Sequence, residues 1–322
     1  MAKPKLAMYW AASCGGCDVA VLDTNEKLLD IANLFDIVFW PIAMDFKYHH
    51  VKEMADKSID LCLFNGAVRS TEQEEIARLL REKSKTLVAF GACACYGGIP
   101  ALANLSNRDE LLHRVYLEAP SNDNEKKVLP GTKTNVAEGE LDLPGLYDTV
   151  KTLAQVVHVE YYVPGCPPPA DLIIKVIDLY AAGKMPPAGA TIASDKTCCD
   201  ECDRIKEDKR VKKFYRPHEI IPDPKKCLLE QGIICMGPAT RGGCGLPCIK
   251  ANMPCRGCFG PPPGVTDQGA KMLSAIASIY QGDNMEEVKK MLEEVVDPAG
   301  TFYRFGMADS MLKRKRLLKG EG

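Results

Sequence analysis

The sequence predicts an α/β fold, in which a flavodoxin-like, doubly wound parallel sheet is followed by a cysteine-rich, mostly irregular and helical region. Short apolar runs alternate with helix-periodic segments in the first half of the chain, and this order is typical of a parallel sheet with crossover helices. Nine of the fifteen cysteines lie between residues 198 and 258, where regular apolar periodicity fades and glycine and proline are frequent.

Five apolar runs of the first half are expected to form the strands of this sheet: 5–11, 36–42, 59–64, 86–92 and 157–163. Residues 17–34, 71–83 and a segment that ends at Tyr180 have apolar side chains at helical spacing. Residues 104–152 are polar and rich in turn-forming residues, so we expect them to form an insertion on the surface.

Length, composition and charge narrow the class of protein. The chain has 322 residues, of which 46% are hydrophobic, and this suffices for one large domain or two modest ones. The uneven placement of the cysteines favours two, expected at 1–185 and 186–322. A net charge of −2 with mixed signs argues against a nucleic-acid binder. The sequence contains no apolar run that is long enough to predict a membrane span, and the N-terminus lacks the features of a signal peptide. We therefore expect a cytoplasmic protein.

Four cysteines of the first half follow the ends of predicted strands. Cys14 and Cys17 follow the first strand, Cys93 the fourth and Cys166 the fifth. Because ligands of an open parallel sheet lie beyond the carboxyl ends of its strands, these thiols can converge on one edge. Glycines beside them allow the backbone to approach a bulky group, and four thiolates are the ligands of a cubane iron–sulfur cluster.

Two other interpretations of these cysteines compete with the cluster. A single CxxC pair is also compatible with a thioredoxin-like redox pair. A lone cysteine at a strand end is usually a small buried hydrophobic residue, and this is what we expect of Cys62 and Cys95. The combination of CxxC with two further strand-end cysteines favours a shared cluster.

The nine cysteines of the second half provide enough thiolates for two four-cysteine sites, with one left over. In a reducing compartment such a set more often binds metal than forms disulfides, and metal ligation stabilises a segment with little core. Two structural zinc sites would use the same number of ligands. The pairs Cys199/Cys202 and Cys255/Cys258 lie about 50 residues apart, however, which is unlike the spacing of a zinc ribbon.

The cysteine motifs resemble those of a known family. CGGC at 14–17, GACA at 91–94 and PGCPP at 164–168 resemble the small subunit of nickel–iron hydrogenases, and the C-terminal cysteines extend the resemblance to nearly the whole chain. The strongest likeness is to the small subunit of the methyl-viologen-reducing, deazaflavin-non-reducing hydrogenase of methanogens. In that family the subunit works with a heterodisulfide reductase.

The resemblance implies three [4Fe-4S] clusters in a row, each with four cysteine ligands. The proximal cluster would be held by Cys14, Cys17, Cys93 and Cys166. The medial cluster would be held by Cys244, Cys248, Cys255 and Cys258, and the distal cluster by Cys199, Cys202, Cys227 and Cys235.

Two features depart from many members of the family. Cys199 stands where many relatives have histidine, and Cys198 is an alternative to it. Cys248 has no counterpart in relatives with a three-iron medial cluster. Additional thiolate ligands add negative charge, so both departures favour clusters of low reduction potential.

The resemblance also implies a function. Electrons from H2 oxidation at the nickel–iron centre of a large subunit would pass through the three clusters to a partner iron–sulfur or flavin protein. The expected partners are a small iron–sulfur electron-transfer subunit and heterodisulfide reductase subunits. This chain would hold no catalytic residue. It would also hold no flavin or nucleotide, because CGGC, and not a glycine-rich phosphate loop, occupies the turn after the first strand. Alternatives are the small subunit of a deazaflavin-reducing hydrogenase, a subunit of a respiratory quinone reductase, and a zinc-stabilised scaffold.

Overall fold

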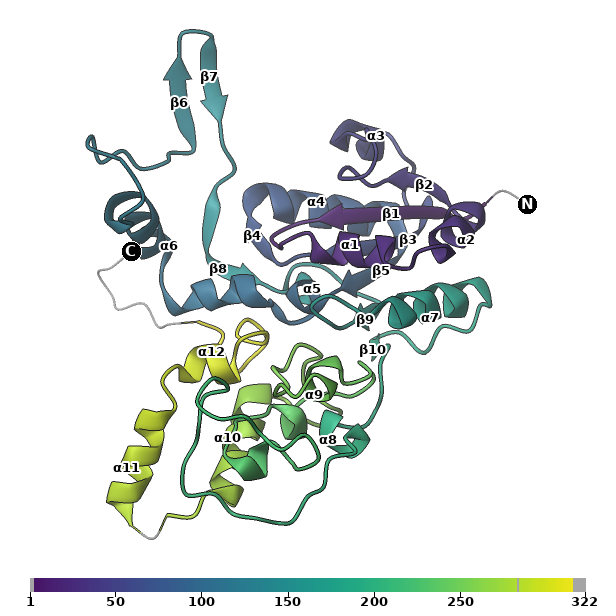
Figure 1. Cartoon of the computed structure of the whole chain (residues 1–322). Coiled ribbons are helices and arrows are strands. Elements are labelled where there is room, and N and C mark those ends of the chain that lie inside the picture. The colour runs from purple at the N-terminus through teal and green to yellow at the C-terminus, as the bar shows by residue number, and fades with distance from the viewer. Residues whose placement is uncertain (1–2, 283, 315–322) are drawn as a thin grey trace.

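The computed structural model describes residues 3–282 and 284–314 (Figure 1). Its first part contains a six-stranded sheet in the order β10-β9-β5-β3-β1-β2, and every neighbouring pair is parallel. This order is flavodoxin-like, so the predicted α/β fold class is confirmed. The strands are β1 (Lys5–Trp10), β2 (Asp36–Phe39), β3 (Ile59–Asn65), β5 (Ser84–Phe90), β9 (Tyr161–Val163) and β10 (Ala190–Thr191).

Helices cover both faces of the sheet, and this explains why its strands are continuous apolar runs. On one face, Ile76, Ala77 and Leu80 of α4 (Thr71–Lys83) share a buried core with Tyr9 and Phe64 of the sheet. The other face is covered by three helices, whose buried side chains pack on β1, β3 and β5. The helices of the two faces are α3 (Tyr48–Lys52) and α4 (Thr71–Lys83), and α1 (Gly16–Leu22), α2 (Lys27–Leu34) and α7 (Ala170–Ala181).

The helix predicted over residues 17–34 is broken in two. Between α1 and α2, Asn25 adopts a left-handed conformation with φ of 53°, which a right-handed helix cannot accommodate. The Thr24 hydroxyl donates a hydrogen bond to the Val21 carbonyl, at 2.7 Å. A helical period is thus present over the whole segment, but local backbone interactions end the first helix early.

The insertion expected at residues 104–152 lies on the surface. It contains α6 (Arg108–His113), a π-helical turn (Arg114–Glu118), a hairpin of β6 (Lys133–Val136) and β7 (Gly139–Asp142), and β8 (Leu146–Lys151). β8 returns to pair with the short β4 (Val68–Ser70) in antiparallel fashion. Figure 1 shows the β6–β7 hairpin projecting away from the sheet, and every residue of its two strands is exposed.

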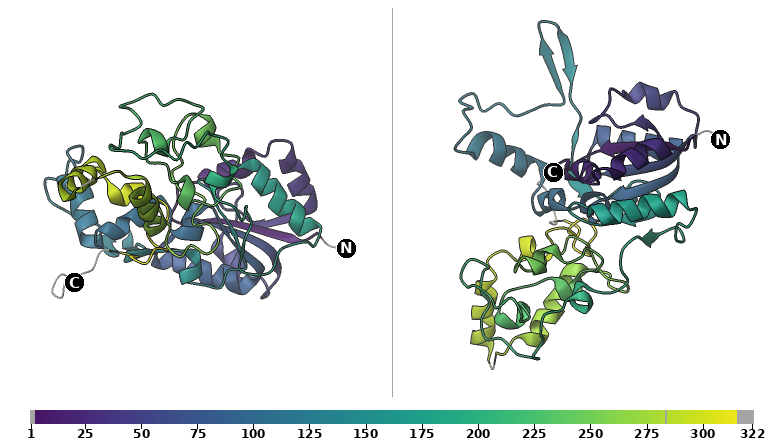
Figure 2. Two further views of the ribbon diagram at one scale, coloured as in Figure 1. Left: turned by 90° about the horizontal axis from the view of Figure 1, so that it is seen from below. Right: turned by 45° about the vertical axis from the view of Figure 1, so that its right-hand side comes forward.

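The second part is mostly irregular, with short helices around a small core that contains Phe214, Ile233, Met236, Met272 and Ile276. It forms a separate lobe beside the sheet (Figure 2). Its helices are α8 (Cys198–Glu201), α9 (Pro247–Lys250), α10 (Gln268–Ile279), α11 (Met285–Glu294) and α12 (Pro298–Phe302), with 3-10 turns at Leu229–Gln231 and Gly237–Ala239.

The two parts are joined through the C-terminal residues. Phe305 belongs to a core cluster of the first part, and its carbonyl accepts a hydrogen bond from the Gly98 N–H at 3.0 Å. The Gln155 side chain donates to the Ala308 carbonyl at 2.8 Å. β10 continues the sheet beyond residue 185, where the first domain is expected to end. The expected division at residues 185 and 186 stays a prediction. Residues 315–322 of the expected second domain lie outside the described residues.

The helices of the described residues are short. The longest, α4, has 13 residues, and α7 and α10 have 12 each. A helix needs about 20 apolar residues to cross a bilayer. Within residues 3–282 and 284–314, no helix combines the length and the apolar character that such a span requires.

Candidate iron–sulfur sites

The first candidate site lies at the carboxyl edge of the sheet, where three loops meet. Cys14 and Cys17 lie in the β1–α1 segment, Cys93 lies in α5 (Ala92–Tyr96) after β5, and Cys166 follows β9. Two hydrogen bonds hold the β5 and β9 loops together, from the Gly91 N–H to the Val163 carbonyl at 2.8 Å and from the Ala92 N–H to the Gly165 carbonyl at 2.6 Å. The strand order therefore brings the four predicted proximal cysteines to one edge.

The thiols of this site are close enough to influence each other's ionisation. Burial raises the pKa of Cys17, and the thiols of Cys93, Cys166 and Cys14 raise it further. Burial, followed by Cys166 and Cys14, raises the pKa of Cys93 to about 12. Four mutually repelling thiolates are unfavourable in this place unless cations such as iron neutralise them.

Two glycines keep the space around the sulfur atoms open. Gly91 has φ of 86°, and a Cβ atom there would collide with the Cys17 Sγ. Gly98 has φ of 58°, and a Cβ atom there would lie 2.5 Å from the Cys93 Sγ. Both the positive φ and the close approach require glycine at these positions.

The second candidate site is a cavity of about 510 Å³ between the two parts of the molecule. All four predicted medial cysteines, Cys244, Cys248, Cys255 and Cys258, border this cavity. Cys166 of the first site also borders it, so the first and second sites are adjacent. Leu246, Ile249, Phe259 and Pro167–Pro169 form much of the remaining wall, and such an apolar shell limits the access of water to a buried metal group.

Cys198, which the sequence leaves unassigned, is the residue that our predictions missed at this cavity. Its side chain is buried and donates a hydrogen bond to the Arg241 carbonyl at 3.2 Å. Hydrogen bonds with Cys198 lower the pKa of Cys244 to about 6 and also lower that of Cys255. Five cysteines of the second half thus surround the cavity, and Cys248 is the exposed one among them.

The third candidate site is a small cavity, of about 20 Å³, that is bordered by the four predicted distal cysteines, Cys199, Cys202, Cys227 and Cys235. Burial, opposed by the Lys206 ammonium, raises the pKa of Cys199 to about 12. Gly237 lies directly beside two of the thiols, since a Cβ atom there would be 3.3 Å from the Cys199 Sγ and 3.6 Å from the Cys235 Sγ.

Buried Arg204 fixes the loops of the third site. Its guanidinium donates hydrogen bonds to the carbonyls of Asp223, Lys226 and Ile249 and to the Asn252 side chain, at 2.8 to 3.1 Å. An arginine is suited to this role because its planar group carries five donors.

The donor set fits iron–sulfur clusters. All fifteen cysteines are free thiols; the predicted distal four border one cavity, and the predicted medial four border another together with Cys166 and Cys198. Backbone N–H groups point at sulfur in each group: Gly16 at Cys14 and Leu246 at Cys244, both at 3.4 Å, and Cys255 at Cys235, at 3.3 Å. Such N–H···S contacts are among the features that set cluster potentials. Within the described residues, no three His, Cys, Asp or Glu side chains are arranged to hold a single metal ion.

Comparison with known proteins identifies the family. A family model described as NADH ubiquinone oxidoreductase, 20 Kd subunit, matches residues 14–180. The iron-sulfur subunit of the F420-non-reducing hydrogenase from Archaeoglobus profundus is 41% identical over 317 residues, which cover 97% of this chain and 98% of that protein. The chain belongs to the nickel–iron hydrogenase small-subunit family, in its F420-non-reducing branch.

A second relative agrees with this placement, and a solved structure shares the fold. The corresponding subunit of the F420-non-reducing hydrogenase from Methanothermobacter marburgensis is 37% identical, with 99% of each chain covered. The recombinant [NiFeSe] hydrogenase of Desulfovibrio vulgaris Hildenborough is similar in fold, with a TM-score of 0.53, 16% identity, and coverage of 88% of this chain and 99% of that chain. As a hydrogenase small subunit, the chain is part of an oxidoreductase whose active site lies in the large subunit.

Proposed function

We propose that this chain conducts electrons through three [4Fe-4S] clusters, from the nickel–iron centre of its large subunit to an iron–sulfur or flavin protein of a heterodisulfide reductase complex. The observation that supports this most strongly is the continuity of the three thiol groups. Cys166 of the first site borders the second cavity. Burial raises the pKa of Cys258, the charge of Cys166 raises it further, and a hydrogen bond with the Cys166 backbone lowers it. The Cys255 N–H of the second site donates to the Cys235 Sγ of the third.

In this proposal the three sites keep the ligands predicted from the sequence. Cys14, Cys17, Cys93 and Cys166 hold the proximal cluster, Cys244, Cys248, Cys255 and Cys258 the medial one, and Cys199, Cys202, Cys227 and Cys235 the distal one. A [4Fe-4S] cluster supplies one-electron redox chemistry when it is bound. The protein holds the thiolates in place, directs N–H groups at sulfur and limits the access of water.

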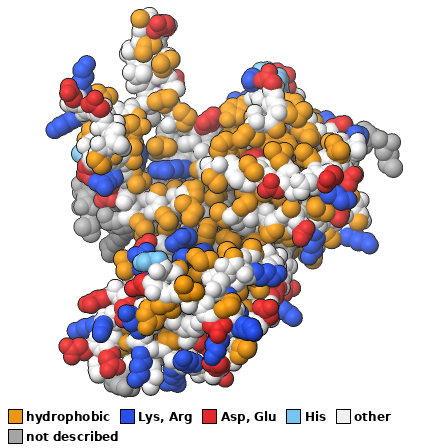
Figure 3. Space-filling view, in the orientation of Figure 1, with side chains coloured by type: hydrophobic (Ala, Val, Ile, Leu, Met, Phe, Trp, Pro, Cys, Tyr) orange, Lys and Arg blue, Asp and Glu red, His pale blue; other side chains and the backbone are white. Residues whose placement is uncertain are grey.

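The large subunit would bind at the open side of the first site. Cys14 and Cys166 are exposed there, and so are the large apolar side chains of Trp10, Val19 and Leu22 in the same part of the chain. Figure 3 shows hydrophobic side chains gathered over the part of the molecule that contains the sheet. Exposed apolar patches of this kind mark protein interfaces.

The remaining parts of the proposal concern the far end of the electron path. A small iron–sulfur electron-transfer subunit would receive electrons from the distal cluster and pass them to heterodisulfide reductase subunits in the cytoplasm. The names of the relatives, which are F420-non-reducing hydrogenases, support this branch over a deazaflavin-reducing one. In this scheme the chain itself holds no flavin or nucleotide.

Two measurements on the anaerobically purified native complex test the proposal. We expect heterodisulfide reductase subunits to co-purify with this chain, and a deazaflavin-reducing flavoprotein in their place would contradict the choice of partner. We also expect Cys235→Ala to lower H2-dependent reduction of the natural acceptor at least about tenfold while isotope exchange between D2 and water at the large subunit continues. Equal loss of both activities would contradict a role confined to electron transfer.

A further inference from the structure

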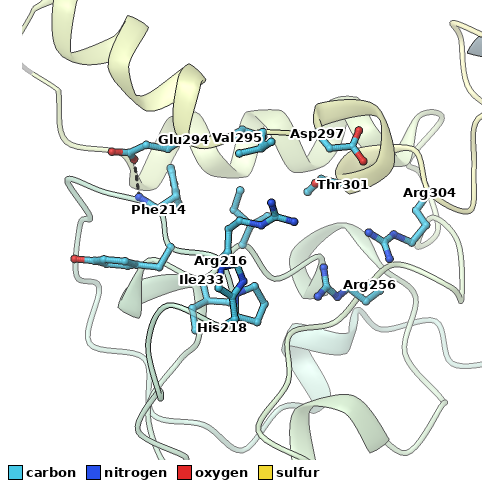
Figure 4. Close-up of a pocket in the computed structure, with 14 residues that line it drawn as sticks. Phe214, Arg216, His218, Ile233, Arg256, Glu294, Val295, Asp297, Thr301 and Arg304 are labelled. Carbon is cyan, nitrogen blue, oxygen red and sulfur yellow. Dashed lines mark hydrogen bonds between the residues drawn. The ribbon is translucent and has the colours of Figure 1, made fainter. Parts of the chain in front are cut away.

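A further pocket lies in the cysteine-rich part, and none of the residues that line it is a cysteine. It has a volume of about 300 Å³ and is bordered by the 214–218 segment, residues 233–234 and the chain around α11 and α12. Three arginines, Arg216, Arg256 and Arg304, line it together with His218. Figure 4 shows that the three guanidinium groups point toward one shared space, and we call this space the arginine pocket.

These guanidinium groups have few acceptors of their own. Within residues 3–282 and 284–314, the guanidinium groups of Arg216 and Arg256 have neither a hydrogen bond nor an ion pair. The Arg304 Nε donates to the Gly300 carbonyl at 2.8 Å, which leaves its two terminal nitrogens available. The half-buried Arg256 and Arg304 both border this space, so their positive charges lie together in it.

The two carboxylates at the border of the pocket are engaged elsewhere. Glu294 accepts a hydrogen bond from the Phe214 N–H at 2.8 Å, and Figure 4 shows its carboxylate turned away from the arginines. Asp297 accepts a hydrogen bond from the Gly300 N–H at the start of α12, also at 2.8 Å. Neither carboxylate lies between the guanidinium groups, so the positive charges meet neither of these anions in the shared space.

Three arginines around one space are suited to a ligand with several anionic oxygens. We propose that this arginine pocket binds a phosphate group, either as free phosphate or as part of a small organic phosphate. Guanidinium forks bind phosphate oxygens in a bidentate manner, and a phosphate group carries about two negative charges against the single charge of a carboxylate. Phe214, Ile233 and Val295 also line the pocket, and their apolar side chains would accommodate the apolar part of an organic phosphate.

Binding there would also act on the electron path, a consequence that rests on the proposed function. Arg256 lies between Cys255 and Cys258 in sequence and borders both the arginine pocket and the cavity of the second site. An anion bound to Arg256 would offset positive charge beside the second site. Because added negative charge lowers cluster potentials, we expect bound phosphate to shift the medial potential downward.

The test is a calorimetric titration of the anaerobically purified full chain with inorganic phosphate, adenosine monophosphate and acetate at low ionic strength. We expect one phosphate per chain, bound more tightly than acetate, which is the carboxylate competitor. Arg216→Gln and Arg304→Gln should each weaken phosphate binding at least about tenfold, since each removes a charge-assisted hydrogen-bond donor. The matched control is Arg210→Gln, because Arg210 is an exposed arginine of the same lobe outside the pocket, and it should change the affinity less than about twofold.

Several outcomes decide the proposal. Tighter binding of adenosine monophosphate than of phosphate would support an organic phosphate as the ligand, and equal binding would support phosphate itself. Absence of saturable phosphate binding, tighter binding of acetate, or unchanged affinity in the double variant Arg216→Gln/Arg304→Gln would overturn it. Iron content is measured on the same samples, so that loss of phosphate binding in a chain with its full iron content contradicts this proposal and leaves the electron-transfer function untouched.

Discussion

At the scale of single residues, two neighbouring cysteines belong to different sites. Cys198 borders the second cavity beside Cys244 and Cys255, whereas Cys199 borders the third. Both lie in the first turn of α8, where successive side chains are about 100° apart around the helix axis because a turn has 3.6 residues. A Cys-Cys pair at the start of a helix therefore predicts two different surroundings, and this signal could have located Cys198.

The first prediction uses alanine substitutions to distinguish cysteines that bind the medial cluster from a cysteine that only lies beside it. Cys248→Ala should reduce the medial cluster to a three-iron form, with a loss of about one iron per chain, because a cubane needs four thiolates. Cys198→Ala should retain the full iron content, since we expect Cys198 to lie beside the medial cluster without binding it, with its S–H donated to the Arg241 carbonyl. Iron analysis with electron paramagnetic resonance measures both. The reverse pattern, loss of iron in Cys198→Ala but not in Cys248→Ala, would exchange the two roles.

The second prediction concerns the glycine beside Cys17. Gly91→Ala should prevent assembly of the proximal cluster, because the new Cβ collides with the Cys17 Sγ and φ is 86°. The matched control is Gly183→Ala, where φ is 63° but no atom lies within 4 Å of the new Cβ. The control should cost about 1 kcal/mol of stability from backbone strain alone and leave the iron content unchanged. Equal iron content in both variants would show that the contact with sulfur is unimportant.

At the scale of secondary-structure elements, the sequence predicts the features that depend on interactions between residues close together in the chain. Helix α4 occupies the predicted residues 71–83, since Ser70 and Gln73 form a capping box at its start. The four proximal cysteines are predictable because strand ends share one edge of a parallel sheet. The pairing of β8 with β4 joins residues more than 75 positions apart, and such a contact leaves no periodic signal in either segment.

The same limit applies to the candidate sites. Cysteine spacing suggests which residues form sets, but the place of Cys198 and the shared border of Cys166 with the second cavity depend on how the two parts pack. The arginine pocket likewise combines Arg216, Arg256 and Arg304, three residues without a common sequence motif. Such sites become visible only when distant segments are brought together.

The third prediction tests the ion pair that ties α4 to the sheet. The Arg81 guanidinium lies 2.5 Å from the Glu160 carboxylate, with side chains only 15% and 19% exposed, and Glu160 also accepts the Leu87 N–H at 2.7 Å. Glu160→Ala should lower the free energy of unfolding by about 3 kcal/mol, because it leaves the largely buried Arg81 charge without a counter-ion and the Leu87 N–H without its acceptor. The control Glu75→Ala removes the exposed pair with Lys52 and should cost less than about 1 kcal/mol. Denaturant unfolding measures both, and equal costs would contradict this account.

At the scale of the whole molecule, the two parts depend on iron to different degrees. The first part has a sheet covered by helices on both faces, whereas the second has short helices and long irregular segments around a small core. In segments with short helices and a small core, metal binding supplies much of the free energy of folding. The C-terminal residues pack back on the first part, so this anchor should remain when the cysteine-rich segment loosens.

The fourth prediction follows from this difference. Removal of iron by an anaerobic chelator should expose backbone amides of residues 198–258 to rapid hydrogen exchange, while amides of β1, β3 and β5 stay protected. Mass spectrometry of peptides from the two parts measures this. Equal protection before and after chelation would show that the second part folds without clusters.

The most direct test of the central claim is the iron and acid-labile sulfide content of the anaerobically purified chain. Three four-cysteine cubanes require about twelve iron and about twelve sulfide per chain, and we predict these values. A colourless protein that holds zinc, or one with about four iron per chain, would contradict the proposal that three clusters form one electron path.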